Sequence, residues 1–531
     1  GGALAAHFAL SWLARRTAPR PWPADLAILL LIVVPAVLPR ARSSPAADRL
    51  NVLLLTIDTL RADRLGFAGY PRGTSPHLDR LARRAEAYAL AVTPQPRTLP
   101  ALASLMTGST PHTHGVRDNF HYTLGEASPT LAETLRHRGW VTAAVNSNPV
   151  LSHDSGIYQG FASADDRGDD WSRLTIVRGI RRLSTLVAMR THDRDEVVTQ
   201  LAAGWLKHRP SPAHPFFLWT HWLAPHMPYE PAPPFDRSFD PDYEGDYARV
   251  LDYGSISKGD MTYRNPLPPR TIEHAKALYD GEVATADRAV GRLLRELEAC
   301  GDLANTLIVL TADHGESLDE QGYFFNHGDF VYGPAANVPL LIAGPNSTSG
   351  HLSRSTVSLI DLAATILERV FIGSDVLPTE GHPIQSVVNS AASAPALFGE
   401  SDFCRFPDLA GDRLGYLLPV EIAQNPERIP DWKEKWEAQA IQAKQRYAIV
   451  GPWKLVLSPH PSADRLELFD ARSDPLDLVN VAPAHPQITK DLEQLVRHWM
   501  QEGENRSTAA GDRVLDEETI ARMKSLGYIG Q

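Results

Sequence analysis

Two aspartates follow directly after apolar segments that are typical of buried strands. Asp58 comes after the run 51–57, Asp313 comes after the run 306–312, and His314 is the next residue. In open α/β sheets, ligands bind at the carboxyl ends of the strands. One aspartate in this position is more often a helix or turn cap, but two carboxylates with an adjacent imidazole suit Zn²⁺, Mn²⁺, Mg²⁺ or Ca²⁺. These side chains therefore predict a site for one divalent metal ion.

A hydroxyl group stands at the start of a separate apolar helix. Thr98 begins the segment 98–108, where it could act simply as the N-cap of the helix. The same position exposes the hydroxyl to free backbone N–H groups and to the positive end of the helix dipole, where an anionic ester would bind. A metal ion on the Thr98 oxygen would lower its pKa and produce an alkoxide nucleophile. Thr98 is thus a candidate for both metal ligand and nucleophile.

Several short motifs, in a fixed order along the chain, resemble the sulfatase family of the alkaline phosphatase superfamily. They span roughly residues 50–480, and the combination is specific although each motif alone is weak. The resemblance implies an α/β fold with a central mixed, mostly parallel sheet between helices, and a small C-terminal antiparallel sheet. The motifs are Asp58–Gly66, Thr98–Gly108, Pro111–Val116, His226–Tyr229, Ala312–Ser317, Asn326–Gly328, Val338–Leu340 and Leu468–Pro475.

The chain departs from the pattern of that family at the nucleophile. Sulfatases carry a Cys or Ser that is converted to formylglycine, in a Cys-x-Pro-x-Arg motif, but here Thr98 occupies the first position and Leu102 the last. Threonine cannot become formylglycine, and neither Cys300 nor Cys404 lies in such a motif. With a threonine in this position, the chain resembles phosphoethanolamine transferases, lipoteichoic-acid-synthase-like enzymes and nucleotide pyrophosphatases, which use a threonine nucleophile. The first two groups bind one metal ion through residues that map to Asp58, Thr98, Asp313 and His314.

The same resemblance implies residues that contact the substrate. His226 and His327 match histidines that line the substrate pocket of the family, where either can protonate the leaving oxygen or hold the ester oxygens. Asn119 and Asn148 are loop residues that would contact the ester, although an Asn in a loop is more often a turn residue.

Charged residues near these positions have a structural interpretation. Arg61 and Asp63 are expected to form an ion pair that holds the loop after Asp58. Glu316 and Glu320 are expected either to support the metal ligands or to be solvated.

Alternating strand and helix patterns after residue 50 position the candidate site. This alternation predicts a catalytic domain over 50–385 with a parallel or mixed sheet covered by helices on both sides. Segments 166–200 and 236–270 break the alternation, and we expect them to be insertions that shape the substrate pocket. The predicted strands are 51–57, 141–145, 216–219, 306–311 and 338–343, and the predicted helices are 76–89, one starting at Ser128, 271–300 and about 360–370.

The C-terminal part, residues 386–531, has a different pattern. Short strand-like runs at 447–450, 454–457 and 466–469 are joined by turns, and a helix is predicted at about 485–501. These elements predict a smaller antiparallel subdomain with a helical tail.

The N-terminal residues 1–49 are rich in Arg and Ala and contain an apolar run. Counted as residues 22–38, this run is at the short end of what crosses a bilayer. A cleaved signal peptide is the alternative, but Pro35 and the arginines that follow fit it poorly. We therefore predict a membrane anchor and linker, which places the catalytic domain outside the cytoplasm, in a periplasm or at the cell surface.

Charge and cysteine content restrict the function further. The 52 Lys and Arg against 63 Asp and Glu give a net charge of −11, which argues against nucleic acid as the main partner. The two cysteines exclude both a disulfide framework and a zinc–thiolate site. The sequence thus predicts a metal-dependent ester hydrolase or transferase with a Thr nucleophile, acting on phosphate mono- or diesters of a lipid or a glycan. The alternatives are a sulfatase without formylglycine and a membrane-anchored protein that binds without turnover.

Overall fold

The computed structural model describes residues 49–165, 191–245, 267–345, 347, 350–389, 395–402, 437–460, 463–506, 510–513, 515 and 519–520. All of them belong to one unit of the chain, which begins at Arg49. Within these ranges no helix is both long and apolar enough to cross a membrane. The predicted membrane span, residues 22–38, lies outside them.

A mixed eight-stranded sheet forms the centre of the fold, in the order β5-β4-β6-β1-β7-β8-β2-β9. Only β8 runs antiparallel to its neighbours, so the prediction of a mixed, mostly parallel sheet is confirmed. Every residue of β1, β6 and β7 is buried, as expected for strands covered on both faces. The strands are β1 (Asn51–Ile57), β2 (Glu86–Val92), β4 (Val141–Asn146), β5 (Ser163–Asp165), β6 (Phe216–Trp222), β7 (Thr306–Ala312), β8 (Asn337–Ala343) and β9 (His351–Ser358).

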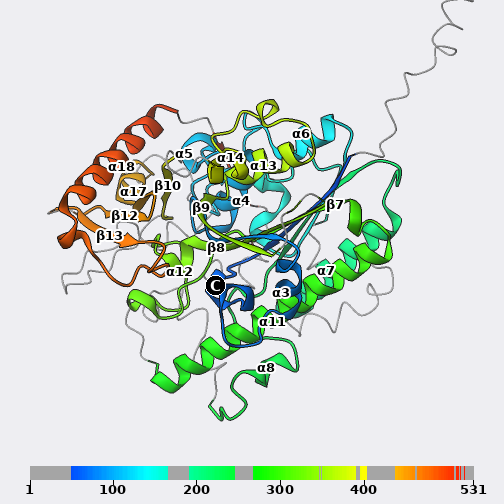
Figure 1. Cartoon of the computed structure of the whole chain (residues 1–531), viewed down its shortest axis with the longest axis horizontal. Helices are drawn as coiled ribbons and strands as arrows, with labels where there is room; N and C mark the ends of the chain where they lie inside the picture. The colour runs from blue at the N-terminus through cyan, green and yellow to red at the C-terminus, as the bar shows by residue number, and fades with distance from the viewer. Residues whose placement is uncertain are drawn as a thin grey trace, which may run out of the picture. The chain divides into compact units, whose positions relative to one another are not determined.

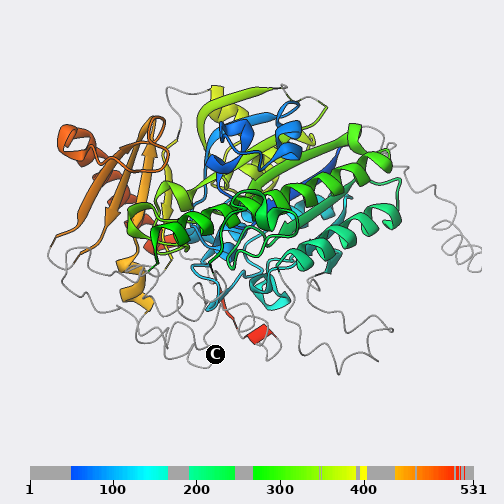
Figure 2. The same ribbon diagram turned by 90° about the horizontal axis from the view of Figure 1, so that it is seen from below.

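Helices lie on both faces of this sheet (Figure 1). On one face α3 (Pro76–Ala82), α7 (Thr191–His208) and α8 (Phe235–Ser238) pack against the long helix α11 (Pro269–Ala299). Figure 2 shows α7 and α11 running side by side across this face. The other face is covered by α4 (Thr98–Thr107), α6 (Leu131–His137), α13 (Asp361–Arg369) and α14 (Ile384–Asn389).

Three sequence-based expectations about these elements are wrong. The helix predicted at 76–89 ends at Ala82, because residues 86–92 form β2 between β8 and β9. The helix predicted to start at Ser128 begins at Leu131, because Thr130 and Glu133 form a capping box: Glu133 N donates to Thr130 Oγ1 over 3.1 Å and Thr130 N donates to Glu133 Oε2 over 2.9 Å.

The third error concerns the expected insertion 166–200. Its end, from residue 191 on, is the start of α7, which packs against β4 and β6 and belongs to the layered fold. Its earlier part, and residues 246–266 of the second expected insertion, lie outside the described ranges.

The C-terminal part contains a four-stranded antiparallel sheet, in the order β10-β11-β12-β13. Its antiparallel character and three of its strands were predicted, whereas β10 was not. The long helix α18 (Pro486–Arg506) packs on this sheet (Figure 1, red on orange). The boundary at 385 stays a prediction. The remaining elements of this part are β10 (Leu397–Glu400), α17 (Glu437–Ala443), β11 (Arg446–Val450), β12 (Trp453–Ser458) and β13 (Arg465–Asp470).

Candidate active site and metal centre

The carboxyl ends of three neighbouring strands bring acidic and imidazole side chains together. β1 lies between β6 and β7, and its register pairs Thr56 with His221 and Ile57 with Ala312. Asp58 and Asp313, which follow β1 and β7, are therefore next to each other and to His221, and all three side chains are fully buried. One ligand atom from each of the three lies within 4.8 Å of the others.

His314 and Thr98 complete this cluster. His314 Nε2 lies 3.4 Å from Asp313 Oδ2, 3.8 Å from Asp58 Oδ1 and 3.4 Å from Thr98 Oγ1. The other ring nitrogen, Nδ1, lies 2.9 Å from the Gly315 carbonyl oxygen, which can only accept a proton. Nδ1 therefore carries the hydrogen, and the lone pair on Nε2 faces the cluster. The structure thus brings together all four predicted metal ligands.

His221 is a candidate ligand that the sequence reasoning missed. The Thr56 hydroxyl donates to the Thr220 carbonyl over 3.2 Å and accepts from the Trp219 indole over 2.9 Å. The Thr56 hydroxyl has a single proton, so His221 Nδ1, 2.9 Å away, is the donor when that proton goes to the Thr220 carbonyl. The lone pair on Nε2 points to Asp58 Oδ2, 3.6 Å away. The signal in the sequence was a single histidine inside an apolar strand, which is more often a core residue.

The donor set fits a divalent cation. Asp58 Oδ1, Asp313 Oδ2 and His221 Nε2 are all buried and have no hydrogen-bond partner. Burial raises the pKa of Asp58 to about 6, and burial together with the negative charge of Asp58 raises the pKa of Asp313. Burial also lowers the pKa of His221 to about 4, so the ring is neutral. The raised carboxyl pKa values mean that the ionised pair has no compensating positive charge within the described residues, and a bound divalent cation would supply that charge.

Thr98 is the first residue of α4 and does not cap it. Arg97 is the N-cap residue, since its carbonyl accepts from Ala101 N over 2.9 Å. The free N–H of Leu99 is satisfied by Asn119 Oδ1 over 2.9 Å, so Asn119 supplies the capping group. The interpretation of Thr98 as a plain N-cap is therefore wrong, and its hydroxyl is left to the cluster with His314.

His226 and His327, the two histidines expected to line the pocket, lie beside the cluster. Their rings are 5.2 Å apart between centroids, and the His327 ring is 4.3 Å from that of His314. His327 Nδ1 lies 3.2 Å from Glu316 Oε1, whereas its buried Nε2 has no hydrogen-bond partner. His226 Nδ1 donates to the Met227 carbonyl over 2.5 Å. Burial lowers the pKa of both histidines, so both rings are neutral.

The two predicted substrate-binding asparagines hold parts of the site itself. Asn148 Nδ2 donates to Asp58 Oδ2 over 2.6 Å, and Asn148 Oδ1 accepts from Val150 N over 2.9 Å. Asn119 uses its carbonyl oxygen on α4, and its buried Nδ2 has no partner. Asn148 therefore orients a candidate metal ligand, while Asn119 retains one donor near the start of α4.

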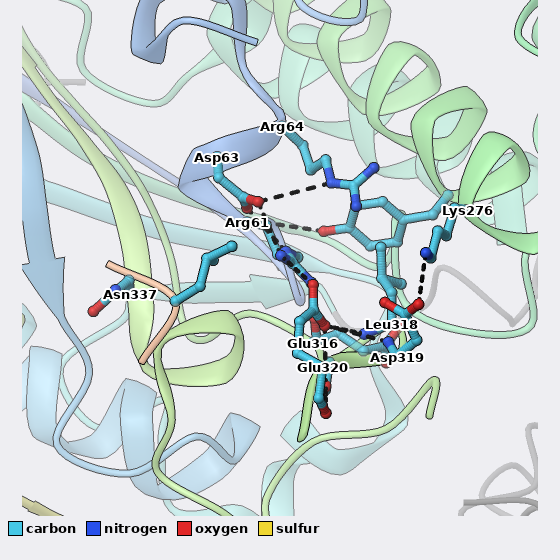
Figure 3. Close-up of polar contacts among 12 residues, drawn as sticks. Arg61, Asp63, Arg64, Lys276, Glu316, Leu318, Asp319, Glu320 and Asn337 are labelled. Atoms are coloured by element: carbon cyan, nitrogen blue, oxygen red, sulfur yellow. Dashed lines mark hydrogen bonds and ion pairs between the residues drawn. The ribbon is translucent and has the colours of Figure 1, made fainter. Parts of the chain in front are cut away.

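Arg61 ties together the loops that follow β1 and β7 (Figure 3). It donates to Asp63 through two 2.9 Å bonds, to the Glu316 carbonyl over 3.0 Å and to Glu320 Oε1 over 2.8 Å. This confirms the expected Arg61–Asp63 ion pair and shows that Glu320 is part of it. Glu316 in turn accepts a hydrogen bond from the Tyr229 hydroxyl and contacts His327. One buried network thus fixes the loops that carry the metal-site residues.

The comparison with known proteins identifies the class of protein that this fold and site define. The family model described as Sulfatase matches residues 50–371, and the chain belongs to the sulfatase family, which is part of the alkaline phosphatase superfamily. It is an ester hydrolase, and members of the family bind a divalent metal ion.

Relatives and solved structures extend this similarity over most of the chain. Human N-sulphoglucosamine sulphohydrolase is 25% identical over 544 aligned positions, covering 95% of this chain and 99% of that protein. A phosphonate monoester hydrolase from Silicibacter pomeroyi superimposes with a TM-score of 0.63 at 21% identity, covering 88% and 99% of the two chains. A structure in complex with its substrate D-glucosamine-2-N,6-O-disulfate has a TM-score of 0.59 at 19% identity, covering 86% and 99%.

Proposed function

We propose that this protein is a metal-dependent hydrolase of phosphate mono- or diesters that uses Thr98 as its nucleophile. The observation that carries the proposal is the position of the Thr98 hydroxyl, 3.4 Å from His314 Nε2 within a buried cluster of two carboxylates and two imidazoles. A secondary alcohol in such a cluster has no capping role to explain it.

Asp58, Asp313, His314 and His221 would hold the metal ion, with Thr98 as a further oxygen ligand. A divalent cation there would offset the carboxylate charges, favour the alkoxide form of Thr98 and neutralise charge on a non-bridging oxygen of the ester. Asn148 keeps Asp58 in place through its 2.6 Å hydrogen bond, and Arg61 keeps the two loops together.

The reaction then has two displacements at phosphorus. Thr98 reacts as the alkoxide, its proton having passed to solvent. Its Oγ1 forms a bond to phosphorus in line with the ester oxygen, the phosphorus–ester-oxygen bond breaks, and the leaving oxygen takes a proton from His327 Nε2. This nitrogen carries a proton in the tautomer whose Nδ1 accepts from protonated Glu316, and burial raises the pKa of Glu316 to about 8. A water molecule next attacks the phosphothreonine, the bond between phosphorus and Thr98 Oγ1 breaks, and the same histidine takes a proton from the water. The orientation of His327 by Glu316 leaves its Nε2 available for both transfers.

A sulfate ester is the second candidate substrate, because the human relative that aligns over 95% of the chain is a sulphohydrolase. The likeness to a phosphonate monoester hydrolase, by contrast, fits chemistry at phosphorus on this fold. A threonine nucleophile favours phosphorus, since threonine cannot supply the formylglycine that the sulfatase motif provides. The proposal also includes an N-terminal anchor that holds the catalytic domain at a membrane, with this domain outside the cytoplasm.

The proposal is tested by a panel of aryl phosphomonoester, phosphodiester and sulfate ester substrates, assayed with Zn²⁺, Mn²⁺, Mg²⁺ and Ca²⁺. We expect turnover of a phosphoester that Thr98→Ala reduces to the background rate. Thr107→Ala removes a buried hydroxyl at the other end of the same helix and should leave turnover unchanged. Undiminished activity in Thr98→Ala would refute the nucleophile, and preference for the sulfate ester would refute the substrate class.

A further inference from the structure

Arg97 is the residue before Thr98, and it places a guanidinium group next to the candidate nucleophile. It is the N-cap residue of α4 with an extended backbone, and its side chain is only 18% exposed. Its Nε lies 2.5 Å from Asp402 Oδ2. Asp402 N in turn donates to the Gly328 carbonyl over 2.7 Å, which connects the pair to the residue after His327.

The guanidinium lies against the backbone of Gly328. A Cβ atom at this position would lie 3.1 Å from the central guanidinium carbon and from Nε, closer than an ordinary van der Waals contact. Gly328 also has a backbone φ of +99°, which residues with a side chain rarely adopt. The segment that carries His327 therefore leaves room for the Arg97 side chain beside the two pocket histidines.

Toward the residues that the structure describes, Arg97 uses one of its five N–H donors. Its sole hydrogen bond within the described ranges is from Nε to Asp402, so its two terminal amino groups donate to no described residue. Arg61 and Arg513, which are 1% and 0% exposed, each use Nε, NH1 and NH2 in hydrogen bonds or ion pairs. A partly buried arginine that is fixed at Nε and open at its terminal amino groups has the form of an oxyanion receptor.

The charge of Arg97 reaches the same cluster. Although burial acts in the opposite direction, the charges of Asp402 and Asp329 raise its pKa, so it stays cationic. In addition to the larger effect of burial, its positive charge lowers the pKa of His226, His314 and His327. These four side chains therefore share one electrostatic environment around Thr98.

We propose that Arg97 is a substrate-binding residue, whose terminal amino groups bind non-bridging oxygens of the phosphoryl group while Asp402 holds its Nε. The phosphoryl identity of the anion rests on the proposed function. The two N–H groups form charge-assisted hydrogen bonds, which fix the phosphorus next to Thr98.

The test is the affinity of the metal-loaded full chain for inorganic phosphate, measured by calorimetry. Because a charge-assisted hydrogen bond contributes roughly 1.5–3 kcal/mol, we expect Arg97→Ala to raise the Kd about 10- to 100-fold with unchanged metal content. Arg97→Lys keeps the positive charge but not the paired N–H groups of the guanidinium. Its Kd for phosphate should therefore lie between those of wild type and Arg97→Ala. Asp402→Asn should have a smaller effect than Arg97→Ala, because the terminal amino groups remain.

Arg369→Ala is the matched control. The Arg369–Glu86 pair has the same side-chain exposures, 18% and 8%, as the Arg97–Asp402 pair. Glu86, however, is the first residue of β2 and lies at the amino ends of the parallel strands, whereas the site lies at their carboxyl ends. We expect this variant to bind phosphate within twofold of wild type. If Arg97→Ala does not fold, as judged by circular dichroism, Arg97→Gln and Arg97→Lys provide the measurement.

Phosphate affinity within twofold of wild type in the Arg97 variants, equal losses in Asp402→Asn and Arg97→Ala, or no binding of phosphate by wild type would each overturn the inference. Failure of the proposed function would show separately, as absence of phosphoester turnover, because phosphate binding is measured without turnover.

Discussion

At the scale of residues, the site depends on lone pairs that face one another in a buried space. The proton positions of His221 and His314 are set by Thr56 and by the Gly315 carbonyl, and both rings present an unprotonated Nε2 to the carboxylates. This arrangement follows from hydrogen bonds outside the cluster. Removing one of these imidazole rings should therefore lower the affinity of the site for a metal ion while both aspartates stay in place.

His221→Ala is expected to lower the affinity for the divalent metal ion about 10- to 100-fold, because a neutral ligand next to Asp58 is lost. The affinity can be measured by titration of metal-free protein and by elemental analysis after dialysis. His137→Ala, which removes an exposed histidine at the end of α6, is the control. Equal metal affinity in His221→Ala and wild type would show that this ring does not belong to the metal site.

The sequence was sufficient to bring together four residues whose types and motif positions are unusual, and their side chains do lie close together: Asp58, Thr98, Asp313 and His314. Their roles stay predictions. The sequence was insufficient for His221, because a histidine within a buried strand is usually a core residue. Only the register between β1 and β6 shows that it lies beside Asp58. The role of Arg97 was equally hidden, since its partner Asp402 is 305 residues away in the chain.

At the scale of elements, buried charged residues connect loops and helices that the sheet alone would leave separate. Arg61 is 1% exposed and joins the loops after β1 and β7, and Asp287 on α11 accepts hydrogen bonds from the backbone of His77 and Leu78 at the start of α3. Each connection has a measurable effect on stability.

Arg61→Ala is expected to lower the free energy of unfolding by about 3–5 kcal/mol, because it leaves the Glu320 carboxylate without its cationic partner and removes a donor from the Glu316 carbonyl. Asp63→Ala should cost less, since the Asp63 side chain is 35% exposed and water can replace it. Denaturant titration measures both values. Equal effects of the two substitutions would contradict the view that Arg61 is the centre of the network.

Asp287 predicts a dependence of stability on pH. Burial raises its pKa from 3.8 to about 7, with smaller opposing effects from the backbone donors and Arg80 and a small additional rise from Asp79. The folded state therefore binds more protons than the unfolded state between pH 4 and 7, so this group lowers the free energy of unfolding as the pH rises through that window.

Asp287→Asn keeps an acceptor for both backbone N–H groups without the buried charge. We expect its stability relative to wild type to increase from pH 4 to pH 8, by at most about 4 kcal/mol. Thermal unfolding monitored across this range provides the measurement, and a difference between the two proteins that stays constant with pH would contradict it.

The elements themselves were predictable where the sequence pattern fits only one kind of secondary structure. The fully buried runs of β1 and β7 could be identified because both faces are covered. In contrast, Glu86–Val92 continues the apolar spacing of α3, and only its pairing with β8 and β9 makes it a strand. Local spacing cannot distinguish these outcomes, since the deciding hydrogen bonds come from residues more than 200 positions away.

At the scale of the whole molecule, a second buried charge cluster connects the antiparallel sheet to the catalytic part. Glu400 on β10 contacts Arg117 over 3.0 Å, Lys444 over 3.2 Å and His112 over 2.9 Å, and its side chain is fully buried. The His112 ring also stacks on Trp499 of α18 at 3.8 Å between centroids. The two sheets are therefore expected to unfold together.

Glu400→Gln should destabilise the whole described unit by about 3–5 kcal/mol, because it removes the buried negative charge that Arg117 and Lys444 contact. Calorimetry should show one cooperative transition at a lower temperature. Arg465→Ala removes a half-exposed arginine, while Glu467 keeps the Tyr332 hydroxyl as a donor, so this variant should have a smaller effect. Two separate transitions in wild type would show that the sheets are independent.

The central claim, that Thr98 is the nucleophile, is tested most directly by trapping the covalent intermediate. Metal-loaded wild-type protein is mixed with a phosphoester substrate that it turns over, quenched with acid within the first turnover and analysed by mass spectrometry of its peptides. We predict a phosphoryl group on the Thr98 peptide that is absent from Thr98→Ala. A phosphoryl group on another residue, or the absence of any adduct together with full turnover by Thr98→Ala, would contradict the account.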